Sequence, residues 1–108
     1  MKILFAAVPL LLLGPLALCA DAADAAHTIA QAGRTFRPGE VTINRNESLT
    51  FTNGDQFIHQ IYVASPNFRF DTDERAPGQN ITQTFTESGT FEVRCHIHPK
   101  MKLVVHVK

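Results

Sequence analysis

The sequence predicts an all-β protein, a Greek-key β-sandwich or barrel of about seven short strands. Stretches of β-branched and aromatic residues alternate with polar residues, as in strands that bury one face. Turn residues recur at intervals of about 8 to 12 positions, and no stretch has the pattern of a helix. The expected strands are 27–32, 40–43, 48–52, 57–63, 80–85, 90–95 and 103–107.

The first two strands are separated by turn chemistry. The segment 27–32 alternates weakly and is expected to be an edge strand. Gly33 and the run 37–39, which holds Pro and Gly, predict turns. Polar and apolar residues alternate in 40–43, which predicts a half-buried strand.

Two more strands follow, each after a polar connection. The run 44–47 predicts a tight link to strand 48–52, in which Leu49 and Phe51 share one face. Asn53-Gly54-Asp55 is a strong turn signal before strand 57–63. By alternation, one face of that strand carries Phe57, His59, Ile61 and Val63.

The segment 64–79 is the least regular part of the chain and is expected to be a long surface excursion. Its Phe68 and Phe70 are expected to pack against the body of the protein. Its mixed charges are expected on the surface: Arg69, Asp71, Asp73, Glu74 and Arg75. After strand 80–85, a turn at 87–89 leads into the last two strands.

The N-terminus resembles a secretory signal peptide covering residues 1–22. A basic residue precedes the apolar run 3–18, which is shorter than the roughly 20 residues that span a bilayer. Small residues then allow cleavage after Ala20 or Ala22. The remainder, 23–108, is expected to be one domain exported to the periplasm.

Charge and hydropathy exclude some partner classes. Lys and Arg together number 10, as do Asp and Glu, so the chain carries no basic excess for binding nucleic acid. No second long apolar segment follows the signal peptide, so we expect no membrane span in the mature form. We also expect the mature form to be a monomer.

The chemistry is concentrated in the loop 95–101, between the last two strands. It holds Cys95, His96, His98 and Met101 within seven residues. Thiolate and thioether ligands beside imidazoles indicate a transition metal, and copper in particular.

The cysteine count supports a metal site. Cleavage removes Cys19, which leaves Cys95 as the single cysteine of an exported domain. Cys95 is then a free thiol, an intermolecular bridge, a metal ligand or a small buried core residue. The neighbouring histidines and Met101 favour the metal ligand.

His59 is the candidate for a ligand from outside the loop. A trigonal His2Cys copper site needs a second histidine, and His59 sits in a strand that a Greek-key fold can bring beside the last two. The alternative is that His59 is an ordinary hydrogen-bonded core residue.

These residues resemble the cupredoxins, the small blue copper proteins that include plastocyanin and amicyanin. The similarity extends over nearly the whole mature chain. It rests on the Phe-x-Pro-Gly-x-Val-Thr-Ile run 36–43, on 49–55 followed by a histidine, and on 89–95 leading into the ligand loop. The two-residue gaps between Cys95, His98 and Met101 are similar to those of amicyanin.

The resemblance implies His59, Cys95 and His98 as equatorial copper ligands and Met101 as a weak axial ligand. Two positions depart from the family pattern. Gln60 follows the first histidine where relatives often have a short polar residue such as asparagine, and His96 lies between ligands where they have a small or hydroxyl residue. His96 is expected to face solvent, with a second metal contact or a proton-linked tuning group as the alternative.

The resemblance implies a one-electron carrier that is not an enzyme, with redox partner proteins as donor and acceptor. Electrons would pass through the exposed edge of His98, beside Ile97, Pro99 and Ile58. Three cations at that end of the protein favour an acidic partner surface: Arg94, Lys100 and Lys102.

Two other functions compete with the electron carrier. His96 makes a periplasmic copper-handling protein, which sequesters or delivers copper, the main alternative. The other is a zinc-stabilised or metal-free sandwich that serves adhesion. Neither His106, in the last strand, nor His27, near the new N-terminus, is expected to bind metal.

Overall fold

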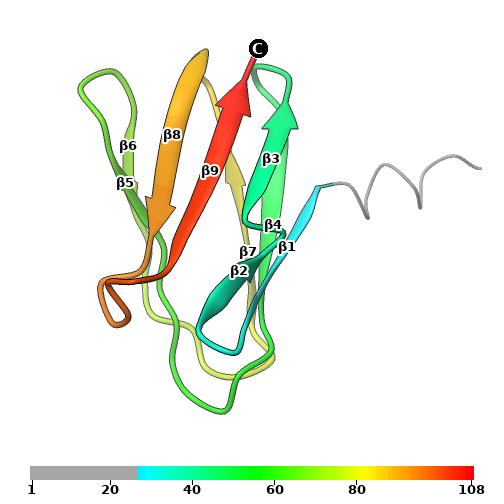
Figure 1. Ribbon diagram of the computed structural model, residues 1–108, viewed down its shortest axis with the longest axis vertical. Helices are drawn as coiled ribbons and strands as arrows, with labels where there is room; N and C mark the ends of the chain where they lie inside the picture. Colours follow the sequence, from blue (N-terminus) through cyan, green and yellow to red (C-terminus); the bar gives the residue numbers. More distant parts are fainter. Residues whose placement is uncertain (1–26) are drawn as a thin grey trace, which may run out of the picture.

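The computed structural model describes residues 27–108, which form a β-sandwich (Figure 1). The predicted signal peptide, its cleavage sites and Cys19 lie outside the described residues. The strands are β1 (Thr28–Ala32), β2 (Thr35–Arg37), β3 (Glu40–Ile43), β4 (Ser48–Asn53), β5 (Tyr62–Ala64), β6 (Arg69–Asp71), β7 (Asn80–Thr84), β8 (Gly89–Arg94) and β9 (Lys102–Val107). Within this part of the chain there is no helix long and apolar enough to cross a lipid bilayer.

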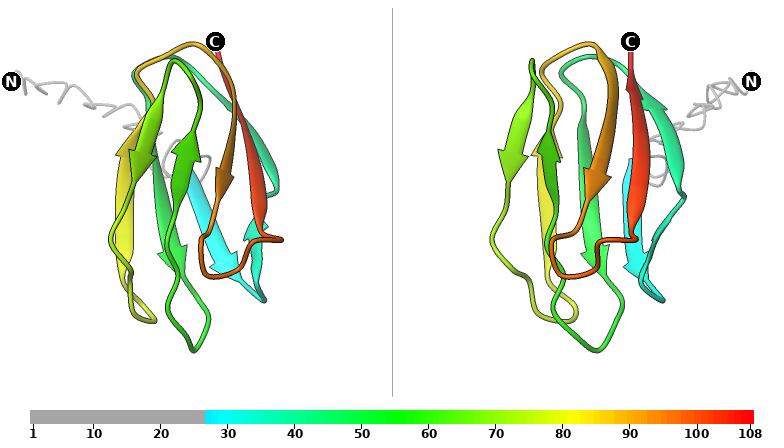
Figure 2. Two further views of the ribbon diagram at one scale, coloured as in Figure 1. Left: turned by 90° about the vertical axis from the view of Figure 1, so that its left-hand side faces the viewer. Right: turned by 60° about the vertical axis from the view of Figure 1, so that its left-hand side comes forward.

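Two sheets pack face to face, as the two turned views in Figure 2 show. One sheet has the order β2-β1-β4-β7 and the other the order β3-β9-β8-β5-β6. Most neighbours are antiparallel, but β1 runs parallel to β4 and β3 runs parallel to β9. The prediction of an all-β sandwich is confirmed.

The described residues form nine strands rather than about seven. The sequence missed β2 and β6, which have only three residues each and show no alternation long enough to recognise. The β1 strand is not at an edge as expected, because β2 folds back on its outer side through the turn at Gly33 and Arg34. Both turn residues have positive φ, the left-handed conformation that tight hairpin turns require.

The predicted strand 57–63 is mostly irregular. Only its last two residues belong to β5, and the rest is a loop held by an isolated bridge between His59 and Arg75. The alternation also fails at Gln60, which is buried although its two neighbours His59 and Ile61 are buried as well. Residues 59–61 are buried in succession, so the side chains of this part of the loop do not alternate between a core face and a solvent face.

The core lies between the sheets and reaches toward the end that carries the ligand loop. Leu49 and Phe51 point inward from β4, as predicted. Phe68 packs against Phe85 and Phe91, with ring centroids 5.4 and 5.3 Å apart, so the expected packing of the excursion is confirmed. Rings in such tilted or edge-on arrangements add to the gain from burying apolar area.

Four connections meet at one end of the sandwich, the lower end in Figure 1. They are the 33–34 turn, the 54–61 loop, the 72–79 segment and the 95–101 loop. Main-chain hydrogen bonds join them to the sheets: Gly54 N–H donates to the Gln31 carbonyl at 2.9 Å, and Gly78 N–H to that of Asn53 at 2.9 Å. The predicted ligands all lie on two of these connections.

Candidate metal centre

His59 is fully buried in the 54–61 loop. Its backbone is held by two hydrogen bonds to Arg75, one in each direction, at 3.1 and 2.8 Å. The backbone from which the His59 side chain extends is therefore held in place, although His59 is not in a regular strand. Phe57 covers it edge-on, with ring centroids 5.2 Å apart.

Asp55 fixes the orientation of the His59 ring. The His59 Nε2 atom lies 2.7 Å from Asp55 Oδ2, and a carboxylate only accepts, so Nε2 donates and, in the neutral ring, Nδ1 keeps its lone pair. Asp55 also accepts from the backbone N–H groups of Gly33 at 2.7 Å and Arg34 at 3.1 Å. Burial alone would raise the pKa of Asp55, but the hydrogen bonds from His59, Arg34 and Gly33 outweigh it and leave the pKa below its usual value.

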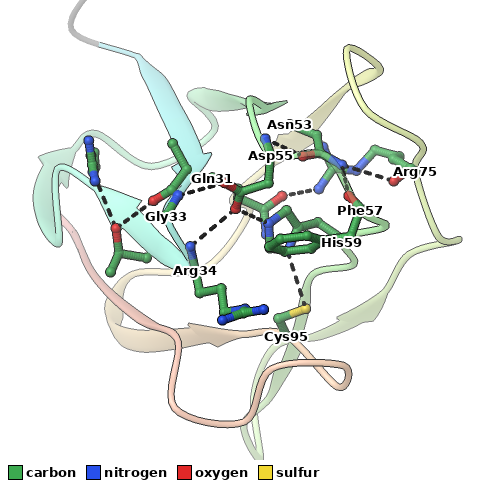
Figure 3. Close-up of polar contacts among 12 residues, drawn as sticks. Gln31, Gly33, Arg34, Asn53, Asp55, Phe57, His59, Arg75 and Cys95 are labelled. Atoms are coloured by element: carbon green, nitrogen blue, oxygen red, sulfur yellow. Dashed lines mark hydrogen bonds and ion pairs between the residues drawn. The ribbon is translucent and has the colours of Figure 1, made fainter.

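Cys95 follows the end of β8 and is buried, with a free thiol. Its Sγ lies 4.0 Å from the Nδ1 atom of His59, so the lone pair of His59 faces the sulfur (Figure 3). First-row metal ions bind imidazole nitrogen at about 2.0 Å and thiolate at about 2.3 Å. A separation of 4.0 Å therefore suits two ligands of one ion better than a direct hydrogen bond.

His98 packs its ring against those of His59 and Phe57, with centroids 5.1 and 5.0 Å apart. Its Nε2 atom is shielded from solvent and has no hydrogen-bond partner, which is uncommon for a buried polar atom. Burial lowers the pKa of His98, a proton on the neighbouring His59 and the charge of Arg34 would lower it further, and Asp55 acts in the opposite direction. A neutral imidazole with an unused nitrogen is the form that binds a metal ion.

Met101 is buried at the end of the loop. Its N–H donates to the His98 carbonyl at 3.0 Å, which closes a turn around Pro99 and Lys100. The loop thus returns its thioether to the same buried region as Cys95.

The donor set fits a copper ion. It combines a free thiol, a histidine lone pair aimed at that thiol, a second histidine with an orphaned nitrogen and a buried thioether. The structure brings His59 Nδ1 to 4.0 Å from Cys95 Sγ and packs His98 against His59. Among the described residues 27–108, however, no three His, Cys, Asp or Glu side chains stand in the arrangement of a formed metal site. The four-residue ligand set thus stays a prediction.

Gln60 and His96, the two departures from the family pattern, contact each other. The His96 N–H donates to Gln60 Oε1 at 3.1 Å, while Gln60 Nε2 binds the carbonyl of Thr72 and the carboxylate of Asp71. The His96 ring is exposed, stacks on Tyr62 at 3.7 Å and approaches Asp71 Oδ2 at 3.1 Å. The longer side chain of Gln60 therefore connects the ligand loop to the segment after β6.

The remaining histidines lie elsewhere. His106, on β9, contacts Glu40 and Thr90 on the outer face of its sheet. His27 lies 2.8 Å from Glu47.

Sequence reasoning missed the polar residues that surround the predicted ligands. The sequence pattern indicates only a turn residue at Asp55 and a surface charge at Arg75. Arg34 lies near the site, with its guanidinium 5.0 Å from the Phe57 ring centroid. One signal was available for Asp55, because it precedes a candidate ligand histidine by four residues and carboxylates commonly orient such histidines.

The model of the copper-binding proteins of the plastocyanin/azurin family matches residues 23–108. This chain belongs to that family. Copper is accordingly its cofactor, and the resemblance to cupredoxins is confirmed.

Solved structures agree with this cupredoxin fold. An oxidised variant of amicyanin is 24% identical, with a TM-score of 0.71 over 83% of this chain and 89% of its own. A purple cupredoxin from Nitrosopumilus maritimus is 22% identical, with a TM-score of 0.66 over 75% of this chain and 98% of its own.

A copper-containing nitrite reductase from Thermus scotoductus SA-01 is also similar. It is 27% identical, with a TM-score of 0.68 over 75% of this chain. The match covers only 22% of the reductase, so the likeness concerns one part of a much longer enzyme.

Proposed function

We propose that this protein is an exported, monomeric one-electron carrier of the periplasm and not an enzyme. His59, Cys95 and His98 would hold one copper ion, with Met101 as the axial ligand. The observation that carries this proposal is the buried 4.0 Å approach of His59 Nδ1 to Cys95 Sγ. Bound copper would supply the exchange between Cu(II) and Cu(I), both of which this donor set accommodates.

The surroundings of the ligands favour electron transfer over substrate chemistry. Asp55 orients His59, and the Met101–His98 turn restrains the loop, so the ligands need not move when the charge of the site changes. Cys95 and His59 are closed off from water. The four proposed donors would together fill the coordination positions of the metal and leave none open for a substrate.

A hollow beside His98 is the proposed docking surface for redox partners. Ile58 and Ile97 are the large apolar side chains most exposed in the described part of the chain, and Ile97 borders the hollow. The lining residues are Arg34, Ile97, His98, Pro99, Lys100 and Met101. Its cations suit a partner with an acidic rim. Arg94 contributes less than expected from the sequence, because Glu92 binds it at 2.8 Å.

The visible and EPR spectra of the purified protein after addition of Cu(II) test the copper site. We expect an intense thiolate-to-copper absorption band that disappears in Cys95→Ser and in His59→Ala. His106→Ala is the matched control and should retain the band, because His106 lies on the outer face of β9. A full band in His59→Ala would refute the proposed ligand set.

Stopped-flow mixing with one-electron reductants and oxidants tests the role. A carrier should be reduced and reoxidised quickly, without loss of copper. A protein that releases its copper on reduction would instead act in copper handling.

A further inference from the structure

Arg75 is a buried cation beside the proposed copper site. It lies in the 72–79 segment, where the sequence indicates surface charges, yet only 5% of its surface is exposed to solvent. Its backbone forms the bridge with His59 described above. Figure 3 shows its side chain extending past His59 to the side chain of Gln31.

The guanidinium of Arg75 has only neutral hydrogen-bond partners. Its Nη1 donates to the carbonyls of Phe51 and Gln79, each at 3.2 Å, and its Nη2 donates to the side-chain oxygen of Gln31. Its Nε is shielded from solvent and has no partner. None of the ion pairs found among residues 27–108 includes Arg75.

A buried charge without a carboxylate acts over a longer range than an exposed one, because little water or salt screens it. Burial lowers the pKa of Arg75, and attraction to a Cys95 thiolate raises it. Arginine nevertheless stays protonated in proteins. The backbone bridge to His59 and the burial of Arg75 hold this cation beside the residues proposed to bind the metal.

We propose that Arg75 is a fixed internal positive charge that biases the metal site toward a monovalent ion and raises its reduction potential. The inference rests on the proposed ligand set. The Cys95 thiolate gives the site a net charge of about +1 with a divalent ion and about zero with a monovalent one, so Arg75 opposes only the divalent state. One electron from an external donor converts Cu(II) to Cu(I), and no protein bond breaks.

Two other charges near the site provide comparisons. The Asp55 carboxylate, bonded to His59, acts in the opposite direction and favours the divalent ion. Arg34 carries the same charge as Arg75 but is exposed, so solvent should screen most of its effect. A comparison of Arg34 with Arg75 therefore separates the effect of burying a charge from the effect of the charge alone.

The test compares Zn(II) and Ag(I) binding to the metal-free protein, together with the copper reduction potential. In Arg75→Gln, the ratio of Zn(II) to Ag(I) affinity should rise by roughly tenfold, and the potential should fall. Arg75→Lys keeps the charge and should preserve both values. Arg34→Gln should change the ratio by less than about twofold.

A purely structural role for Arg75 predicts a different result. Both Arg75 variants would then weaken the binding of Zn(II) and Ag(I) equally, without a change in the ratio of the two affinities. This outcome would overturn the inference. Equal effects of Arg34→Gln and Arg75→Gln would overturn it too.

If Arg75→Gln does not fold, Gln31→Glu serves instead. It leaves the guanidinium in place and gives it a carboxylate partner, so the ratio should rise as for Arg75→Gln. An unchanged ratio would refute the inference. Failure of the proposed function is distinct, because the wild-type protein would then show no thiolate-to-copper band at all.

Discussion

Asp55 Oδ2 and His59 Nε2 lie 2.7 Å apart, four residues from each other in the chain. This contact determines which nitrogen of His59 faces Cys95. Carboxylates in this position orient ligand histidines and increase their basicity, and their loss commonly weakens metal binding by about 10- to 100-fold.

Replacing Asp55 by alanine should weaken copper binding within that range, because the His59 ring loses its orientation. Competition against a chelator of known affinity measures the change. The control is Asp73→Ala, at an exposed position in the excursion. Equal copper affinities in the two variants would contradict the orienting role.

The metal-free protein should lose stability in acid through Asp55. The folded pKa of Asp55 is below its usual value of 3.8, so its stabilising contribution is complete above that value and is lost as the pH falls through the folded pKa. Denaturant unfolding at pH 6 and at pH 3 should show a larger drop for the wild type than for Asp55→Asn. The same drop in both proteins would assign the acid sensitivity to other groups.

Met101→Gln should retain copper but change its reduction potential, because a weak axial ligand affects the potential more than the copper affinity. Met101 is also buried, so the polar replacement should cost some stability. Met101→Leu, which keeps the packing, separates the two effects. Loss of copper from both variants would show that the thioether is a primary ligand.

Gln60→Ala should loosen the ligand loop, since it removes the acceptor of the His96 N–H and the contacts to the 71–72 segment. These groups are only partly buried, so the loss should cost less than the roughly 1–3 kcal/mol of a fully buried unpaired group. Hydrogen exchange should accelerate at the His96 amide. Gln56→Ala, at an exposed position in the 54–61 loop, should leave that amide unchanged.

The long, regular strands could be predicted from the sequence because each one buries a single face. In β4, Leu49 and Phe51 alternate with polar residues and reach the core as expected. The three-residue strands β2 and β6 could not be predicted, because they exist only through pairing with β1 and β5. Pairing of this kind depends on turn geometry and on distant segments, which leave little local pattern.

The ligand loop could be predicted because its sulfur and imidazole groups lie close together in the sequence. Its polar support could not, because burial of Arg75 depends on acceptors from Gln31 and Phe51, far away in the chain. A charged residue in an irregular, charge-rich segment is usually on the surface, and sequence alone gives no reason to depart from that expectation.

The position of β9 has a consequence for how the protein acquires its structure. This last strand lies inside the second sheet, between β3 and β8, rather than at its margin. The pairing of Glu40 with Val104 joins segments from opposite ends of the domain, and such long loop closures slow folding. The second sheet can therefore close only when β9 inserts between β3 and β8, so the 95–101 loop, which leads into β9, should reach its folded position late in folding.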